Sequence, residues 1–337
     1  MPNIKANRLQ ADGAAQADQN PKFTALLDKL NHPDEWHRPA CYWFWQHIPS
    51  KEEIAAKLSE LKAGGFGSFQ IAARLSLPLE DYLSDEYLKA CRITADLASK
   101  QGLMMGIYDD YNWQSGHAGG RAAALNPDIK ERHLFWSHID VAKYFEEHQD
   151  ANPALWAEDE ISEEPIELTI SGIHSGDAEC LFEVGKNWIY EGGRPAWDEW
   201  ELIGVYHVGA DGTTITDLFE MWKQHPNLFA LQTDENSICF LIHPVILKSL
   251  KLPGHLALFA AARCKTSRMV NYLLPETAKA FIKTTYEPYA KALGKHLGTT
   301  VRYTFFDQPH SCFYQWEGND GNLRSSLMYS REFMNKL

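Results

Sequence analysis

Strand-like and helix-like segments alternate through residues 41–108, and this order constrains the fold more than any other feature of the chain. Three short apolar runs have the length and composition of buried strands, at residues 41–45, 66–72 and 103–108. Two segments with helical spacing lie between them, at residues 50–65 and 84–102. Such units form parallel sheets with right-handed crossovers. The sequence therefore predicts an α/β fold.

Both of these helices carry start and stop signals. Ser50 stands three residues before Glu53, which is a capping-box signature, and Gly64-Gly65 ends the first helix. Ser84 can cap the second helix, which stops at Gly102. The boundaries of the predicted elements therefore follow from local chemistry as well as from the apolar pattern.

The character of the chain changes after about residue 136. A helix is predicted to begin just before this point, at Asn126-Pro127-Asp128, because proline is favoured in the first turn. Strand-like runs separated by Gly, Asp and Pro turns then follow, at residues 166–170, 180–184, 202–208 and 238–242. Helical spacing returns over residues 275–298, with Pro288 expected to kink or divide the helix, and a further strand is predicted at 301–306. The segment between the helices reads as an antiparallel β insert.

Composition and charge exclude several classes of function. The chain has 337 residues and a net charge of -13, which argues against nucleic acid as a partner, because such binding needs clustered Lys and Arg. No window reaches the roughly 18 apolar residues of a membrane span. The six cysteines form no CxxC pair, and no signal-peptide pattern stands at the start, so a cytoplasmic protein with reduced thiols is expected.

Acidic side chains follow two of the predicted strands directly. Asp109 and Asp110 come after residues 103–108, and Asp307 comes after residues 301–306. In parallel α/β architectures, ligands bind at the carboxyl ends of the strands. We therefore expect polar and aromatic groups from several strand ends to converge there: Trp45, His47, Gln70, Arg74, Asp109, Asp110 and Asp307.

Paired carboxylates of this kind suit glycoside hydrolysis, and they also suit calcium. The alternative is that these acids cap helices or pair with Arg74, Arg121 or Arg302. No GxSxG, P-loop or HExxH motif is present, and no cofactor is predicted. Residues 116–120 could cradle a phosphate, but the two preceding acids would repel it. No metal site is predicted from the histidines.

Three segments together carry a family resemblance: Trp43-Phe44-Trp45 with residues 54–69, Tyr108 to Gly120, and Thr304 to Pro309. They resemble the large barrel glycoside hydrolases related to the α-L-rhamnosidases of glycoside hydrolase family 106, over residues 38–135 and 265–310. The resemblance implies a partial TIM-type β/α barrel with an inserted antiparallel β domain. Its predicted parts are a flexible tail (1–25), the first part of the barrel (26–135), the insert (136–250) and the barrel continuation (251–337).

The resemblance also implies the roles of the site residues. Asp109, Asp110 and Asp307 would be catalytic, and the sugar contacts would come from Trp45, His47, Gln70, Arg74, Trp113, His117 and Gln308. The chain departs from the family pattern, where Asp-Glu stands in place of Asp109-Asp110 and Asp-Glu-Pro in place of Asp307-Gln308-Pro309. Glutamine cannot transfer a catalytic proton, and only four barrel-type strands are predicted where a barrel has eight.

The resemblance and these departures together leave two functions open. The first is a glycoside hydrolase acting on a plant or microbial polysaccharide or oligosaccharide, with an α-L-rhamnoside as the substrate that the resemblance implies. The second is a non-catalytic carbohydrate-binding or degenerate homologue. A barrel fragment that does not fold stably by itself is a third reading, which a cooperative melt would exclude.

Overall fold

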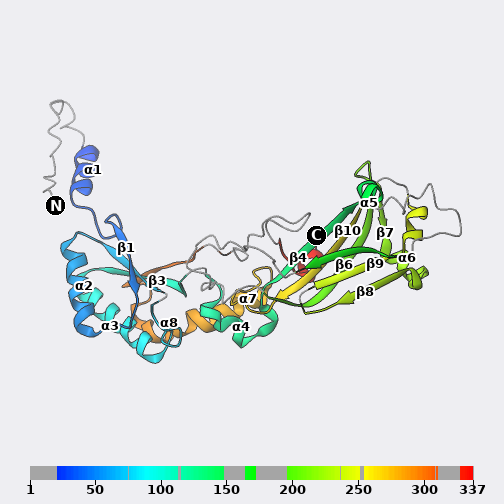
Figure 1. Ribbon diagram of the computed structural model, residues 1–337. Coiled ribbons are helices and arrows are strands. Elements are labelled where there is room, and N and C mark those ends of the chain that lie inside the picture. Colours follow the sequence, from blue (N-terminus) through cyan, green and yellow to red (C-terminus); the bar gives the residue numbers. More distant parts are fainter. Residues whose placement is uncertain are drawn as a thin grey trace. The chain divides into compact units, whose positions relative to one another are not determined.

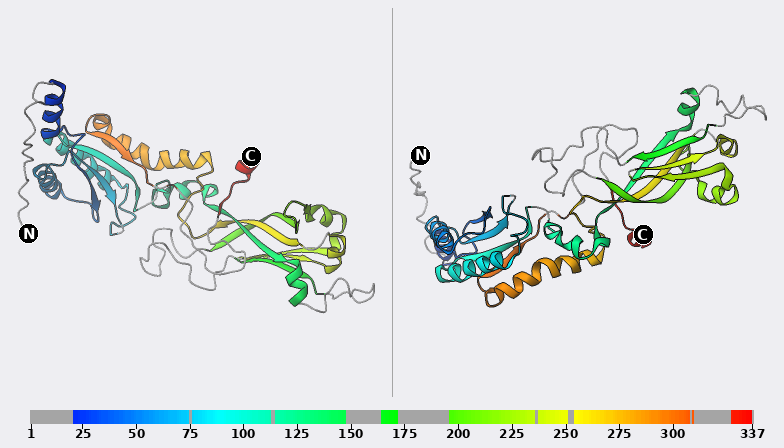
Figure 2. Two further views of the ribbon diagram at one scale, coloured as in Figure 1. Left: turned by 90° about the horizontal axis from the view of Figure 1, so that it is seen from above. Right: turned by 60° about the horizontal axis from the view of Figure 1, so that its bottom comes forward.

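The computed structural model describes residues 21–336, apart from 75, 113–114, 148–163, 172–195, 236, 251–253, 308 and 310–326 (Figures 1 and 2). The chain divides into two compact units, Met1–Tyr108 with Tyr289–Phe305, and Asp109–Pro288 with Phe306–Leu337. The predicted domain boundaries at 135 and 250 divide the chain elsewhere and stay a prediction. No helix in the described part of the chain is long and apolar enough to cross a membrane.

The first unit contains a four-stranded sheet of order β1-β2-β3-β11. Its strands are β1 (Ala40–Trp45), β2 (Ser68–Ala73), β3 (Met104–Tyr111) and β11 (Val301–Phe305). Strand β1 pairs parallel with β2, and β11 pairs parallel with β3. The α/β fold predicted from the sequence is therefore confirmed. Within the described ranges these four strands do not close into a barrel.

Two helices of the first unit follow the predicted capping signals, α2 (Lys51–Ala63) and α3 (Asp85–Gln101). A further helix, α1 (Pro21–Asn31), was not predicted from the sequence. Ser50 and Glu53 form both bonds of a capping box, and α2 buries Ile54, Leu58 and Leu61. Ser84 caps α3, which ends at Gly102 in the left-handed region, at φ 65°. Local sequence signals thus set both crossover helices.

The second unit contains two antiparallel sheets. A five-stranded sheet has the order β12-β4-β10-β6-β7, and a three-stranded sheet has the order β5-β9-β8. The strands are β4 (Arg132–Asp140), β5 (Ile166–Ser171), β6 (Trp197–Gly209), β7 (Ile215–Asp217), β8 (Phe229–Thr233), β9 (Ser237–Ile242), β10 (Gly254–Cys264) and β12 (Leu327–Met328). The predicted strands at 166–170, 202–208 and 238–242 are confirmed, and 180–184 lies outside the described residues.

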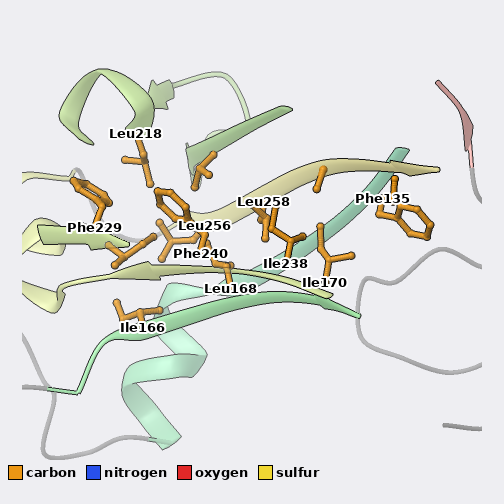
Figure 3. Close-up of a cluster of buried hydrophobic side chains, with 14 of the residues drawn as sticks. Phe135, Ile166, Leu168, Ile170, Leu218, Phe229, Ile238, Phe240, Leu256 and Leu258 are labelled. Carbon is orange, nitrogen blue, oxygen red and sulfur yellow. The ribbon is translucent and has the colours of Figure 1, made fainter. Parts of the chain in front are cut away.

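A hydrophobic core lies between these two sheets (Figure 3). Leu256 and Leu258 of β10 are buried on the same core as Leu168 of β5 and Phe240 of β9. Burial alternates along β5 and β9, as expected for strands with one face on a core. This unit also carries α4 (Arg121–Leu125), α5 (Val141–Glu147), α6 (Leu218–Gln224), α7 (Pro275–Phe281) and α9 (Arg331–Met334).

Two predicted elements differ from the structure. The helix expected at Asn126 is a single 3-10 turn, Pro127–Ile129, because β4 begins at Arg132 and pairs with β10. The strand expected to end at Tyr108 continues to Tyr111, so that both aspartates belong to β3. Tertiary pairing and the loop that follows override the local signals at these positions.

Candidate functional site

Asp109 and Asp110 are neighbouring residues of β3, and both are completely buried. Successive side chains of a strand point to opposite faces. The two carboxylates accordingly have different hydrogen-bond partners, although every partner named below belongs to the second unit. They are therefore two separate sites rather than one pair of equivalent acids.

The Asp110 carboxylate is surrounded by backbone donors. One oxygen, Oδ2, accepts the N–H groups of Gly116, His117 and Ala118 at 3.0, 3.0 and 2.9 Å. The other, Oδ1, accepts those of Gly119 at 3.1 Å and Tyr111 at 2.6 Å. Burial raises the pKa of Asp110, and His117 and the backbone donors oppose this rise. The loop after β3 is thus wrapped around a carboxylate of its own chain.

The backbone of this loop requires its glycines. Gly116, Gly119 and Gly120 have φ values of 127°, 63° and 91°, which side chains rarely adopt. A Cβ atom on Gly116 would also lie 2.5 Å from the ring of Tyr272. The N–H groups that could have cradled a phosphate point at Asp110 instead, so the loop is an anion site that the chain itself occupies.

His117 lies in the same loop and is 1% exposed. Its Nδ1 atom is 3.5 Å from Oδ1 of Asp110. The imidazole of His117 therefore lies beside the Asp110 carboxylate, which is also bonded to the backbone of the same loop.

The Asp109 carboxylate is held by side-chain hydroxyls from distant parts of the sequence. Ser115 Oγ donates a short hydrogen bond to Oδ1, and the Tyr286 hydroxyl donates a short one to Oδ2. Ser115 Oγ in turn accepts the N–H of Asp307 at 2.7 Å, and the N–H of Ser115 donates to the carbonyl of Asp307 at 2.9 Å. Ser115 thereby joins the second acidic segment to the first.

A π-helical turn carries Tyr286. The helical segment runs through α7, a π turn at Ile282–Tyr286 and α8 (Glu287–Leu293). Pro288 cannot donate the N–H that an α-helix requires at this point, so the regular pattern cannot continue through it. The helix is divided ahead of Pro288, as the sequence predicted, and the turn is of a type common at functional sites.

Burial governs the electrostatics around Asp109. It raises the pKa of this carboxyl from 3.8 to about 6, and hydrogen bonds from Ser115 and Tyr286 oppose the rise. The pKa of Tyr272 is raised well above its ordinary value by burial and then by Asp110, Glu131 and Asp109. The Tyr272 hydroxyl donates to the carbonyl of Ser115 at 2.7 Å. A carboxyl group with this pKa changes its protonation state near pH 6.

The structure brings four of the predicted site residues into one unit: Asp109, Asp110, His117 and Asp307. Asp307 is partly exposed and joins the group through its backbone. Trp113 and Gln308 lie outside the described residues.

The other predicted sugar contacts belong to the first unit. Trp45 is 1% exposed and packs edge-on against Tyr87, whereas His47 is exposed and lies 3.2 Å from Glu53. Gln70 is buried on β2, and the guanidinium of Arg74 lies over the ring of Phe44 at 4.4 Å. The prediction that these four side chains converge with the aspartates stays a prediction.

Three residues of the site are not among those predicted from the sequence: Ser115, Tyr272 and Tyr286. Ser115 is part of a segment that drew attention for its glycines and aromatics, and Tyr286 stands two residues before the proline that divides its helix. That proline was the available signal, since it marks a local departure from α-helical geometry. Nothing in the local sequence of Tyr272 indicates its role.

In the described ranges, no three His, Cys, Asp or Glu side chains are grouped so that they could hold a metal ion. Asp110 presents both oxygens to N–H groups, and such donors repel a cation. Asp110 therefore does not fit the role of a calcium ligand.

Neither a family model nor a curated protein matches the chain. Among solved structures, a rhamnosidase from Novosphingobium sp. PP1Y is similar, with 13% sequence identity and a TM-score of 0.42. The match covers 86% of this chain and 40% of that one. The chain thus spans less than half the length of that rhamnosidase.

Proposed function

We propose that the chain forms part of the sugar site of a glycoside hydrolase, in which Asp109 is the carboxyl group that transfers the proton. The observation that carries this proposal is the environment of Asp109. A fully buried carboxyl with a pKa of about 6 is protonated in a large share of molecules at mildly acidic pH. Glycoside hydrolysis needs such a carboxyl as its general acid.

The reaction would proceed at the glycosidic oxygen. The protonated Asp109 would give its proton to this oxygen as the bond to the anomeric carbon breaks. A second carboxylate would then activate water or attack the anomeric carbon, and Asp307 is our candidate because its backbone is bonded to Ser115. The Ser115 and Tyr286 hydroxyls would stabilise the Asp109 anion after the proton has left.

The finer assignments rest on the motif resemblance. They are an α-L-rhamnoside as substrate, a partial TIM-type barrel as the scaffold, and Trp45, His47, Gln70, Arg74, Trp113, His117 and Gln308 as sugar contacts. We propose Asp110 as the anchor of the glycine loop, because five backbone N–H groups use its two oxygens.

One observation favours the second candidate, a carbohydrate-binding protein without hydrolytic activity. Each oxygen of Asp109 accepts a hydrogen bond from a protein hydroxyl, as each oxygen of Asp110 accepts backbone donors. Such saturated carboxylates can be structural, and Gln308 stands where the related hydrolases have a glutamate. In that case sugars would bind without being cleaved.

Turnover of aryl glycosides, α-L-rhamnoside included, separates the two candidates. Catalysis predicts that Asp109→Asn and Asp307→Asn each lower kcat/KM about 100-fold or more. Asp128→Asn is the matched control, since its side chain is 89% exposed. Unchanged turnover in both variants would contradict the hydrolase assignment, and calorimetric sugar binding with no turnover would establish the binding protein.

A further inference from the structure

A cavity of about 570 Å³ lies in the second unit, away from the aspartates of β3. Strands β4, β6 and β10 form its floor, and residues from Tyr329 to Asn335 border it. Its lining is Leu134, Ile203, Tyr206, Phe259, Tyr329, Arg331, Met334 and Asn335. Phe259 alternates with the core residues Leu258 and Ala260, so its ring is on the sheet face opposite the hydrophobic core. The volume falls in the range of small-molecule sites, about 300–1,000 Å³.

Two aromatic rings form one wall of this cavity. The rings of Tyr206 and Phe259 are 6.0 Å apart and inclined at 64°. Gly204 pairs with Phe259 across the strands, and a Cβ atom there would lie 2.4 Å from the Tyr206 ring. The glycine leaves space for the Tyr206 ring to lie against the sheet, as glycines within strands do at close approaches. The sequence thus builds an apolar wall here rather than a filled surface.

Positive charge marks the other side of the cavity. Arg331 pairs with Glu201 through a short contact, and Arg132 pairs with the same carboxylate at 3.1 Å. One carboxylate therefore serves two guanidinium groups. The side chain of Arg331 is 67% exposed, so its fork can reach a second acceptor.

Beyond Arg132, the ion pairs continue away from the cavity. Glu199 accepts from Arg132 at 3.0 Å and from Arg263 at 2.7 Å, and Asp128 lies 3.8 Å from Arg263. The carboxylates are thus more plentiful at the far end than beside Arg331. Among the described residues, three guanidinium groups thus meet three carboxylates, and Arg331 has one carboxylate partner where the other two have two each, so an added carboxylate would be its second.

We propose that this cavity binds a small ring-bearing carboxylate, with the ring against Tyr206 and Phe259 and the carboxylate on Arg331. An apolar ring face buries its C–H surface on the aromatic wall. A single carboxylate matches the planar fork of Arg331. A neutral ligand forms no ion pair with this guanidinium, and a dianion meets stronger repulsion from Glu201 than a monoanion does. This site is separate from Asp109, so it does not depend on the hydrolase assignment.

Two kinds of molecule have this chemistry: a sugar acid such as a uronate, and an aromatic acid such as benzoate. Titration of the full chain, followed by NMR chemical shifts, distinguishes them with glucuronate, benzoate and neutral glucose. We expect at least one of the acids to bind and glucose to bind at least tenfold more weakly. Binding of glucuronate alone identifies a sugar-acid site, and binding of benzoate alone identifies an aromatic-acid site.

Two variants test the assigned contacts. Arg331→Gln should weaken binding of the acid about tenfold or more and leave glucose unaffected, because it removes the guanidinium charge and fork that the carboxylate would contact. Tyr206→Leu should weaken it by removing part of the wall. Arg92→Gln and Phe23→Leu, both at exposed positions, are the matched controls and should bind as the wild type does.

The proposal is overturned if neither acid binds, if glucose binds as tightly as the acids, or if Arg331→Gln binds them unchanged. Arg331 is exposed on a four-residue helix, so its replacement should leave the fold intact. Asp109→Asn should bind the acid normally. Loss of turnover in that variant with binding retained separates the two proposals.

Discussion

The two carboxylates at the end of β3 are adjacent in sequence and held in opposite ways. Asp110 is bonded to backbone N–H groups that lie within nine residues of it. Asp109 is bonded to the hydroxyls of Ser115 and of Tyr286, the latter 177 residues away. The first arrangement shapes a local loop, and the second depends on the assembled fold.

The difference matters because a backbone donor and a hydroxyl behave differently when a proton arrives. Five N–H groups can only donate, so they favour the ionised carboxylate and oppose the rise that burial causes in the pKa of Asp110. The hydroxyls of Ser115 and Tyr286 can rotate and accept, so the Asp109 site can hold a protonated or an ionised carboxyl. We therefore assign the structural role to Asp110 and the titrating role to Asp109.

The largest effect expected is the loss of stability when Asp110, the anchor of the glycine loop, is replaced. Asp110→Ala leaves the N–H groups of the loop buried without an acceptor and should destabilise the protein by about 3–5 kcal/mol. Urea unfolding measures this as a lower midpoint with an unchanged slope. Asp128→Asn, on an exposed side chain, should unfold like the wild type. A urea midpoint for Asp110→Ala equal to that of the wild type would contradict the structural role assigned to Asp110.

The next effect concerns the pH dependence of stability. The pKa of Asp109 is raised in the folded protein, so the folded state holds this proton more tightly than the unfolded state. The free energy of unfolding should therefore fall as pH rises from about 3 to about 7, by about 3 kcal/mol from this group. Asp109→Asn lacks this contribution.

Urea unfolding of both proteins at pH 4 and pH 7 isolates the contribution of Asp109. The difference in free energy of unfolding between Asp109→Asn and wild type should move by about 2 kcal/mol in favour of the variant between these pH values. Groups that do not interact with Asp109 cancel in this comparison, whereas the neighbouring Asp110, whose charge raises the pKa of Asp109, contributes to the difference. A constant difference would mean that Asp109 has an ordinary pKa.

A glycine substitution tests the geometry of the anchored loop. Gly116→Ala forces a side chain onto a residue at φ 127° and against the Tyr272 ring, and should cost about 2 kcal/mol. Gly212→Ala is a suitable control, because it has a φ of 66° but no atom near the added Cβ. A cost no larger than that of the control would show that the contact with Tyr272 has no effect.

The smallest effect expected comes from removing one of the two hydroxyl groups that bond the Asp109 carboxylate. Tyr286→Phe removes one donor that lowers the pKa of Asp109, so this pKa should rise above about 6. The loss of one hydrogen bond should cost about 1 kcal/mol of stability. The midpoint of the Asp109 carboxyl titration measures the shift, and a lowered midpoint would contradict the assigned hydrogen bond.

Sequence reasoning predicted the parts of the structure that depend on neighbouring residues. The capping box at Ser50, the stop at Gly102 and the division of the helix before Pro288 are local, and each is present. The four strands of the first sheet are also close to the predicted places, except that β3 continues to Tyr111. Acids at the strand ends led to Asp109 and Asp307, which the structure joins through Ser115.

The partners of Asp109 could not be predicted, because they depend on long-range contacts. Tyr286 reaches Asp109 only after α7 and its π turn have packed. The same holds for Tyr272, whose hydroxyl bonds a residue 157 positions earlier in the chain. Neither the difference between the two aspartates nor the cavity at Arg331 has a local sequence signal.

The central claim is that the pKa of Asp109 is raised to about 6. The most direct test is an NMR titration of the side-chain carboxyl carbons of Asp109 and Asp110, with Asp109→Asn used to assign the signals. We predict that the Asp109 signal titrates with a midpoint at about pH 6 and disappears in the variant. A midpoint near its ordinary value of 3.8 would contradict the account, since Asp109 would then be an ordinary ionised carboxylate with no proton to transfer.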